Sequence, residues 1–456
     1  MKAARRARSR ARGARRRRGS RGRAVASWFG MYQDDALPRR PFLGLELRAR
    51  PAEGVSEGLP VVRVAEGGAA ALAGVRAGDR LLSLGGATVS EPRALVALVR
   101  GLVPGAPLHF EIVRDGARVT LPGKATPLPV EHIAGAEVRL GHVTVRGSWR
   151  QRTLLAIPTS GKPPFPGILF LSGLGTGSCE LSQDPEDPMR QLLEGLAAAG
   201  IATMRVERSG VGDSEGPPCQ TLGFFDELQG YYDANLALCH EPLVGDQVVF
   251  GHGLGGMMAP FLAGRGLNVR GVAVFGTTSH KWVDCMVRAT RQQRVLAGME
   301  GEELETYVAA WSEMYTSVCR EGIFPRDVFA RRPEFAWLEG TSCHGETMFG
   351  RHVSLFQEIE RLELSALWRM TNVPVLVLHG SYDWAAAPDE GRMIADEIAA
   401  ASPGRSRFVL LDKVAHDMRR HESLAQSFRN PRAGVRDEGL LRAVLEWLAH
   451  EGLVST

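Results

Sequence analysis

The amino-acid sequence predicts an α/β protein in which a small β-rich domain precedes an eight-stranded, mostly parallel sheet covered by helices. From residue 135 to residue 456, short apolar runs alternate with helix-like segments, as in parallel sheets with helices on both faces. Residues 41–125 instead carry closely spaced strands and a hairpin turn. The composition, 44% hydrophobic and 23% charged over 456 residues, is that of a globular protein with two or three domains.

Residues 1–30 are predicted to be a disordered, arginine-rich tail. The first 24 residues hold Lys2 and eleven arginines without an acidic residue, so the rest of the chain has 43 basic and 51 acidic residues, a net charge of −8. Such a tail either has no role or binds polyanions nonspecifically through phosphate contacts. A twin-arginine export signal is not predicted, because no long apolar segment follows the arginines.

The apolar runs and the cysteines exclude several classes of protein. No run approaches the ~18 consecutive apolar residues of a membrane helix, so no transmembrane segment is predicted. The six cysteines are scattered without a C-x-x-C pair, which argues against a zinc site and a disulfide framework. Reduced thiols are typical of the cytosol, and we therefore predict a cytoplasmic protein without a bound metal.

Residues 41–125 have the strand pattern of a compact domain. Residues 42–47 alternate like a strand, and residues 61–64 form a second apolar run. Residues 91–101 have helical spacing, and Asp115-Gly116 predicts a hairpin between two further strands.

Two motifs in this domain resemble PDZ domains of the bacterial protease-associated kind. One is Phe42-Leu43-Gly44-Leu45, and the other is A-x-x-A-G-h-x-x-G-D-x-h-h-x-h over residues 70–84, where h is apolar. The resemblance implies that a peptide C-terminus adds as a strand, with its carboxylate on the backbone N–H groups of the loop Phe42, Leu43, Gly44 and Leu45. The alternative is a small β-domain that packs on the rest of the chain and binds no peptide.

Residues 126–134 are predicted to be a linker, because Pro127 and Pro129 interrupt any strand or helix there. The remaining residues, 135–456, contain eight predicted strands and at least five helices. The predicted strands are 137–145, 151–157, 167–171, 202–206, 247–250, 271–275, 373–378 and 407–411. The predicted helices include 188–199, 225–239, 256–264, 389–401 and 440–450. An aromatic-rich, helix-patterned insertion at about 278–368 is expected to be a lid.

A glycine-rich turn at residues 251–255 carries the strongest functional signal. The apolar run at 247–250 leads into Gly251-His252-Gly253-Leu254-Gly255, and a helix-like segment follows. This arrangement resembles the nucleophile elbow, G-x-S-x-G, of α/β-hydrolases, with Gly253 where serine is expected. Asp383 and His416 follow in the order of that family's triad. The resemblance covers roughly 310 residues and implies acyl or carboxylic-ester substrates and no cofactor.

The resemblance also implies a role for each of these residues. Asp383 would hold His416 in one tautomer, so that the second ring nitrogen acts as a base. The backbone N–H groups of Leu254 and Leu174 would form the oxyanion hole. The block at residues 207–216 is interpreted as support beside the site, because it lacks the G-x-G-x-x-G spacing of a dinucleotide site.

Without a serine, three interpretations stay open. In the first, His416 activates water or a substrate proton, and acyl chemistry is weak or altered. In the second, the chain is a pseudoenzyme that binds a small acyl or ester ligand while the PDZ-like domain recruits partners. In the third, another nucleophile replaces the serine, and the candidates are Cys179, Ser279 and Cys285.

Overall fold

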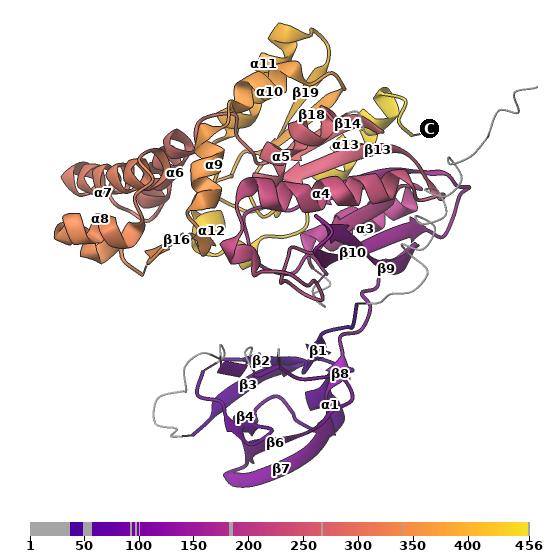
Figure 1. The fold of residues 1–456 in the computed structure, drawn as a ribbon, viewed down its shortest axis with the longest axis vertical. Coiled ribbons are helices and arrows are strands. Elements are labelled where there is room, and N and C mark those ends of the chain that lie inside the picture. Colours follow the sequence, from indigo (N-terminus) through magenta and orange to yellow (C-terminus); the bar gives the residue numbers. More distant parts are fainter. Residues whose placement is uncertain are drawn as a thin grey trace, which may run out of the picture.

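In the computed structural model, the chain forms a small β domain beside a larger α/β domain (Figure 1). It describes residues 37–48, 57–91, 94–95, 98–99, 101–181, 186–265, 268–340 and 342–454. The arginine-rich tail predicted over residues 1–30 lies outside these ranges. No helix among the described residues is long and apolar enough to cross a membrane.

The larger domain is built on an eight-stranded sheet in the order β19-β18-β14-β13-β11-β12-β10-β9. Strand β10 pairs antiparallel with β9 and β12, and the other neighbouring pairs are parallel. The strands are β9 (Ala136–Val145), β10 (Trp149–Pro158), β11 (Phe165–Leu171), β12 (Ala202–Val206), β13 (Val244–His252), β14 (Val269–Phe275), β18 (Val375–Gly380) and β19 (Ser406–Leu411). The eight predicted strands and the mostly parallel sheet are thus confirmed.

Helices cover both faces of this sheet, and the apolar residues of each strand divide between the two faces. In β11, Leu169 and Leu171 join one buried cluster, while Ile168 and Phe170 join the other. This is the two-residue alternation of a strand buried on both sides. The helices of the first cluster are α4 (Phe224–Cys239), α5 (Leu254–Ala263) and α11 (Pro388–Ala401). Those of the second are α3 (Pro188–Ala198) and α13 (Gly439–His450).

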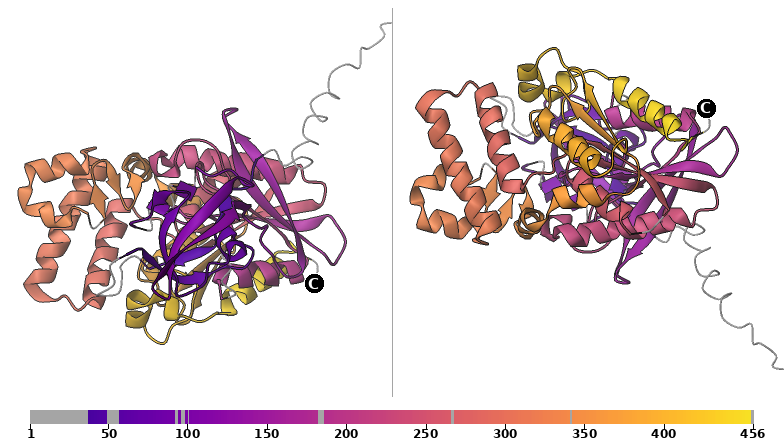
Figure 2. Two further views of the ribbon diagram at one scale, coloured as in Figure 1. Left: turned by 90° about the horizontal axis from the view of Figure 1, so that it is seen from below. Right: turned by 90° about the horizontal axis from the view of Figure 1, so that it is seen from above.

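Between β14 and β18 the chain forms a helical insertion that projects to one side of the sheet (Figures 1 and 2). Its elements are α6 (Trp282–Leu296), α7 (Gly301–Tyr315), α8 (Pro325–Arg331), β15 (Cys343–His344), β16 (Thr347–Met348), β17 (Arg351–His352), α9 (Ser354–Arg361) and α10 (Leu364–Met370). Most of its aromatic side chains are buried; Trp282 and Phe356, for example, stack with ring centroids 5.3 Å apart. Trp337 is an exception at 46% exposed. The aromatic pattern therefore marks mainly the core of the insertion.

The small domain has the sheet order β2-β3-β4-β6-β7, with β5 beside β4. Its elements are β1 (Pro41–Phe42), β2 (Leu45–Leu47), β3 (Leu59–Val64), α1 (Ala69–Ala73), β4 (Arg80–Leu84), β5 (Ala87–Thr88), β6 (Pro107–Arg114) and β7 (Ala117–Lys124). The hairpin turn is confirmed, because Asp115 and Gly116 both have positive φ, 50° and 79°. The helix predicted at 91–101 falls partly outside the described residues.

Two predictions at the edges of the small domain were wrong in detail. The continuous strand at 42–47 is interrupted at Gly44, whose φ of +72° turns the chain. Pro127 lies inside the short strand β8 (Thr126–Pro127), which pairs antiparallel with β1. A two-residue edge strand tolerates proline because a residue on its outer side has no hydrogen bond to donate to a neighbouring strand.

Candidate active site

Gly253 forms the sharp turn between β13 and α5. Its backbone has φ +51° and ψ −114°, a region that glycine occupies without steric cost. The turn is fixed by three hydrogen bonds: the Gly253 N–H donates to the Phe275 carbonyl at 3.0 Å, and the Gly253 carbonyl accepts from the Gly256 N–H at 3.0 Å and the Thr277 hydroxyl at 2.8 Å. A Cβ on the flanking Gly255 would lie 2.2 Å from the Leu171 carbonyl oxygen, so the close approach of α5 to β11 requires glycine there.

Asp383 and His416 lie together after the last two strands of the sheet. Asp383 follows β18, and its Oδ2 lies 2.8 Å from Nδ1 of His416, which follows β19. The other carboxylate oxygen of Asp383 accepts from the N–H groups of Ala385 and Ala386 at 2.8 and 2.9 Å. A Cβ on Gly276 would come within 3.0 Å of both Asp383 Oδ2 and His416 Nδ1. The absence of a side chain at Gly276 therefore leaves room for the pair.

The two groups shift each other's pKa. Burial would lower the pKa of His416, but the charge and hydrogen bond of Asp383 outweigh burial and raise that pKa above its ordinary 6.5. Burial would likewise raise the pKa of Asp383, but His416 and the surrounding hydrogen bonds hold that pKa below its ordinary value. Asp383 is thus a carboxylate that fixes the tautomer of His416 and leaves Nε2 as its free ring nitrogen.

The free nitrogen of His416 faces the turn at Gly253. A Cβ on Gly253 would lie 3.5 Å from His416 Nε2 and 3.7 Å from the Cα of Gly173, which are its nearest contacts among the described residues apart from its two chain neighbours. Gly173 belongs to the glycine turn, which we define as residues 173–177 after β11. Three segments far apart in the sequence therefore surround one small space beside Gly253.

A second histidine, which the sequence did not single out, supports His416. His252 precedes Gly253, and its ring lies 4.7 Å from the His416 ring between centroids. Its Nε2 lies 3.0 Å from the His416 carbonyl oxygen. Burial, and then the nearby charge of His416, lower the pKa of His252 to about 3. His252 is therefore neutral, and its Nε2–H donates to that carbonyl. Its position inside the glycine motif was the one available signal.

Two buried arginines hold the carbonyl groups of the glycine turn. Arg208 donates to the carbonyl oxygens of Gly173 and, at 2.7 Å, Gly175. Arg351, from β17 of the insertion, lies 3.4 Å from the carbonyl oxygen of Leu174. Both arginines share the buried carboxylate of Glu227, at 2.6 and 2.5 Å. The support expected from the block at 207–216 is thus present, whereas the contribution of Arg351 could not be read from the sequence.

The oxyanion-hole candidates are two backbone N–H groups, one in the glycine turn and one at the start of α5. Leu254 is the first residue of α5, and Leu174 lies in the middle of the glycine turn. Among the residues that the structure describes, the N–H groups of Leu174 and Leu254 donate to no protein acceptor.

Among the described residues, none of the three candidate replacement nucleophiles is hydrogen-bonded to His416. Burial, and next the charge of Glu207, raise the pKa of the Cys179 thiol well above its ordinary value. Burial, and next Glu390, raise the pKa of Cys285 to about 12, so both thiols stay protonated and weakly nucleophilic. The Ser279 hydroxyl is buried, and no hydrogen-bond partner for it exists within the described ranges.

No group of three or more His, Cys, Asp or Glu side chains that could hold a metal ion occurs within the described part of the chain.

Comparison with known proteins agrees with this architecture. Residues 41–122 match the PDZ domain, and residues 168–426 match the alpha/beta hydrolase family. A probable periplasmic serine endoprotease, DegP-like, from Pseudomonas fulva (strain 12-X) is 34% identical over 111 residues, which are 24% of this chain and 22% of that protein. The chain thus spans about a fifth of that relative. Because that relative is described as periplasmic, the cytoplasmic location expected from the cysteines stays a prediction.

Several solved structures are similar to this chain at low sequence identity. The esterase Pf2001 from Pyrococcus furiosus is 13% identical, with a TM-score of 0.42 over 71% of this chain and 95% of that chain. Est1E from Butyrivibrio proteoclasticus with ferulic acid is 16% identical, with a TM-score of 0.45 over 68% and 98%. An enol-lactonase from Burkholderia xenovorans LB400 is 19% identical, with a TM-score of 0.40 over 68% and 99%. The family match extends over more than half of the sequence, and the chain therefore belongs to the alpha/beta hydrolase family and carries an N-terminal PDZ domain.

Proposed function

We propose that the hydrolase domain binds a small acyl or ester ligand, and that Gly253 stands at the position of the missing nucleophile. His416, oriented by Asp383, acts on a water molecule beside Gly253. The supporting observation is the 3.5 Å distance between His416 Nε2 and the point where a Cβ on Gly253 would lie. A water oxygen slightly farther from the Gly253 Cα, where a serine hydroxyl would otherwise sit, is within hydrogen-bond reach of Nε2.

The proposed reaction is direct hydrolysis without an acyl-enzyme. His416 Nε2 takes a proton from water as the water oxygen bonds to the substrate carbonyl carbon. The N–H groups of Leu254 and Leu174 stabilise the negative charge that develops on the carbonyl oxygen. When the tetrahedral intermediate collapses, the bond to the leaving group breaks and the protonated His416 returns its proton to that group.

Magnitudes limit the substrates. Removing the serine from a triad lowers turnover by about 10⁶-fold. The remaining oxyanion hole and binding contacts still accelerate the reaction about 10³- to 10⁴-fold over water. Substrates with good leaving groups, such as aryl or enol esters and thioesters, need the least further assistance, and we expect activity on these first.

Gly253 also supports a second candidate function, in which the site binds an acyl ligand without turning it over. The PDZ domain would then recruit a peptide partner, and the arginine-rich tail would hold a polyanion nonspecifically. The two candidates differ in whether wild-type turnover depends on His416.

The test compares the wild type with Gly253→Ser and His416→Ala on short and medium aryl esters. The matched control is His344→Ala, because the side chain of His344 is 80% exposed on the insertion. The proposal expects wild-type turnover that His416→Ala abolishes and His344→Ala preserves. Wild-type activity at background, with a gain of several orders of magnitude in Gly253→Ser, would instead overturn the proposed hydrolysis and favour the binding function.

A further inference from the structure

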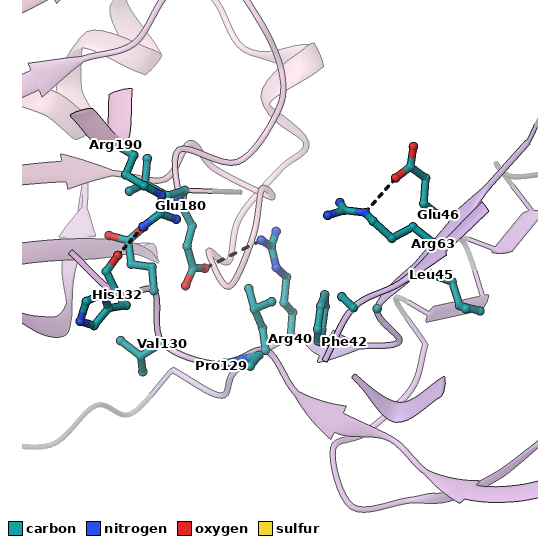
Figure 3. Close-up of a pocket in the computed structure, with 15 residues that line it drawn as sticks. Arg40, Phe42, Leu45, Glu46, Arg63, Pro129, Val130, His132, Glu180 and Arg190 are labelled. Atoms are coloured by element: carbon teal, nitrogen blue, oxygen red, sulfur yellow. Dashed lines mark hydrogen bonds and ion pairs between the residues drawn. The ribbon is translucent and has the colours of Figure 1, made fainter. Parts of the chain in front are cut away.

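A cleft separates the PDZ domain from the hydrolase domain, and both domains line it. One part, ≈ 730 Å³ in volume, is bounded by Leu43, Gly44 and Leu95 of the PDZ domain and by Thr176, Val211 and Gln220 of the hydrolase domain. A second part, ≈ 770 Å³, continues past Phe42 and Leu45 toward Glu180 and Arg190 of the hydrolase domain (Figure 3). The peptide loop of the PDZ domain thus faces the hydrolase domain.

The PDZ side of this cleft offers an open strand edge and free donors. In the part of the chain that the structure describes, strand β2 ends its sheet and pairs only with β3, so its other edge can accept an added strand. Among the described residues, the N–H groups of Leu43 and Gly44 donate to no protein acceptor, and both residues line the cleft. Leu95 and Val99 form an apolar wall nearby. The strand edge, the free N–H groups and the apolar wall together fit a peptide C-terminus whose last residue has an apolar side chain.

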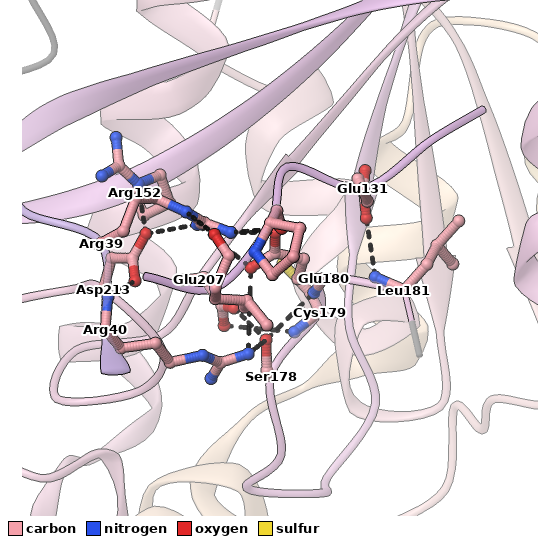
Figure 4. A network of polar contacts seen from close by, with 12 residues as sticks. Arg39, Arg40, Glu131, Arg152, Ser178, Cys179, Glu180, Leu181, Glu207 and Asp213 are labelled. Atoms are coloured by element: carbon pink, nitrogen blue, oxygen red, sulfur yellow. Dashed lines mark hydrogen bonds and ion pairs between the residues drawn. The ribbon is translucent and has the colours of Figure 1, made fainter. Parts of the chain in front are cut away.

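Polar contacts tie the start of the peptide loop to the hydrolase wall (Figure 4). The Arg40 N–H donates to Asp213 Oδ1 at 2.7 Å, and the Arg40 guanidinium donates to the Ser178 hydroxyl at 3.3 Å. The Arg39 guanidinium pairs with Asp213 at 2.5 Å and with Glu180 at 2.6 Å. The segment entering the PDZ loop is therefore held by two hydrolase loops, one after β11 and one after β12.

The same two loops build the candidate active site. The loop after β11 contains the glycine turn and continues to Ser178, whose hydroxyl donates a hydrogen bond to the Glu207 carboxylate. The loop after β12 contains Arg208, which holds the carbonyls of the glycine turn, and Asp213, which holds Arg40. Any shift of these loops by a ligand in the cleft thus reaches the glycine turn through few contacts.

We propose that the cleft is one composite peptide site, read by both domains. A peptide C-terminus with an apolar last residue adds to β2, places its carboxylate on Leu43 and Gly44, and contacts Gln220 of the hydrolase domain. Its binding biases the glycine turn. The peptide contact is independent of the proposed hydrolysis, and only the consequence of that bias for turnover rests on the proposed function.

The test measures binding of fluorescein-labelled seven-residue peptides ending in Val, Leu or Phe to the full chain. Each peptide is compared with its C-terminally amidated form. We expect the free acid to bind about tenfold or more tightly than the amide, because the amide leaves the loop without its charged partner. We expect Gln220→Trp, which fills the hydrolase wall, to weaken binding about tenfold. The matched control Ser160→Trp, at an exposed position outside the cleft, should leave affinity unchanged.

Amide hydrogen exchange measures the coupling between the peptide site and the glycine turn, and it does not require turnover. A failure of this coupling can therefore be distinguished from a failure of the proposed hydrolysis. Saturating peptide should change the exchange rates of amides in residues 173–178 and 208–213. Equal affinity of free-acid and amidated peptides would overturn the proposal. So would tight binding that is unaffected by Gln220→Trp and leaves exchange in both hydrolase loops unchanged, because the PDZ domain would then bind its peptide alone.

Discussion

At the level of single residues, both turnover and the stability of the fold depend on the protonation of His416. Asp383 raises the pKa of His416, so protonated His416 stabilises the fold below pH 6.5, and this stabilisation is lost as pH rises through the raised pKa. A base must be neutral to accept a proton. Turnover and this part of the stability therefore depend on pH in opposite directions.

We predict that the wild-type rate rises with pH, with a midpoint above 6.5. Asp383→Asn removes the charge that raises the pKa, so the midpoint should move downward and the rate should fall. The measurement is kcat/KM for an aryl ester between pH 5 and 9. A midpoint that is identical in the wild type and Asp383→Asn would show that His416 is not the titrating base.

Gly276 gives a second prediction at this scale. An alanine Cβ there would lie 3.0 Å from both Asp383 Oδ2 and His416 Nδ1, so Gly276→Ala should separate the pair and lower the rate by about 10²-fold or more. Gly301→Ala is the control, because Gly301 has the same φ of +60° but no atom within 4 Å of such a Cβ. Equal losses in both variants would attribute the effect to backbone strain alone.

At the scale of elements, the sequence predicted the strands and core helices better than the contacts between them. All eight strands of the large sheet were found, and the inner strands β11, β14 and β18 are apolar runs buried on both faces, which leave a strong local pattern. The contact between Arg351 of β17 and the glycine turn joins residues 177 positions apart. No local pattern marks such a contact, and an arginine in an insertion is usually exposed.

We predict that Arg351→Met destabilises the protein by about 3 kcal/mol, because it removes one of the two buried partners of Glu227. It should also lower turnover, since the carbonyl of Leu174 loses its contact. The control is Arg326→Met on the same insertion, where a 53% exposed side chain should contribute about 1 kcal/mol or less. Chemical denaturation measures the free energy of unfolding of both variants, and equal losses would contradict a special role for Arg351.

At the scale of the whole molecule, two segments connect the domains, and Arg39 joins them. Besides Asp213 and Glu180, its guanidinium donates to the carbonyls of Leu128 and Pro129 in the linker, at 3.0 and 2.9 Å. The sequence showed a linker and two domains but not this junction. Its partners come from three separate segments, the linker and the loops after β11 and β12, which only the folded chain brings together.

Arg39→Ala should therefore free the PDZ domain to move relative to the hydrolase domain. We expect a larger radius of gyration by small-angle X-ray scattering and weaker coupling between the peptide site and the glycine turn. Arg118→Ala, which removes a 70% exposed side chain from the PDZ domain outside the cleft, is the control. An unchanged scattering profile for Arg39→Ala would show that the other interdomain contacts suffice.

Intact-protein mass spectrometry of the wild type, quenched during turnover of p-nitrophenyl butyrate, tests whether His416 activates water without an acyl-enzyme. We expect product release with unmodified protein mass, and a butyryl adduct only in Gly253→Ser. A butyryl adduct on the wild-type chain would contradict this expectation and reveal a replacement nucleophile.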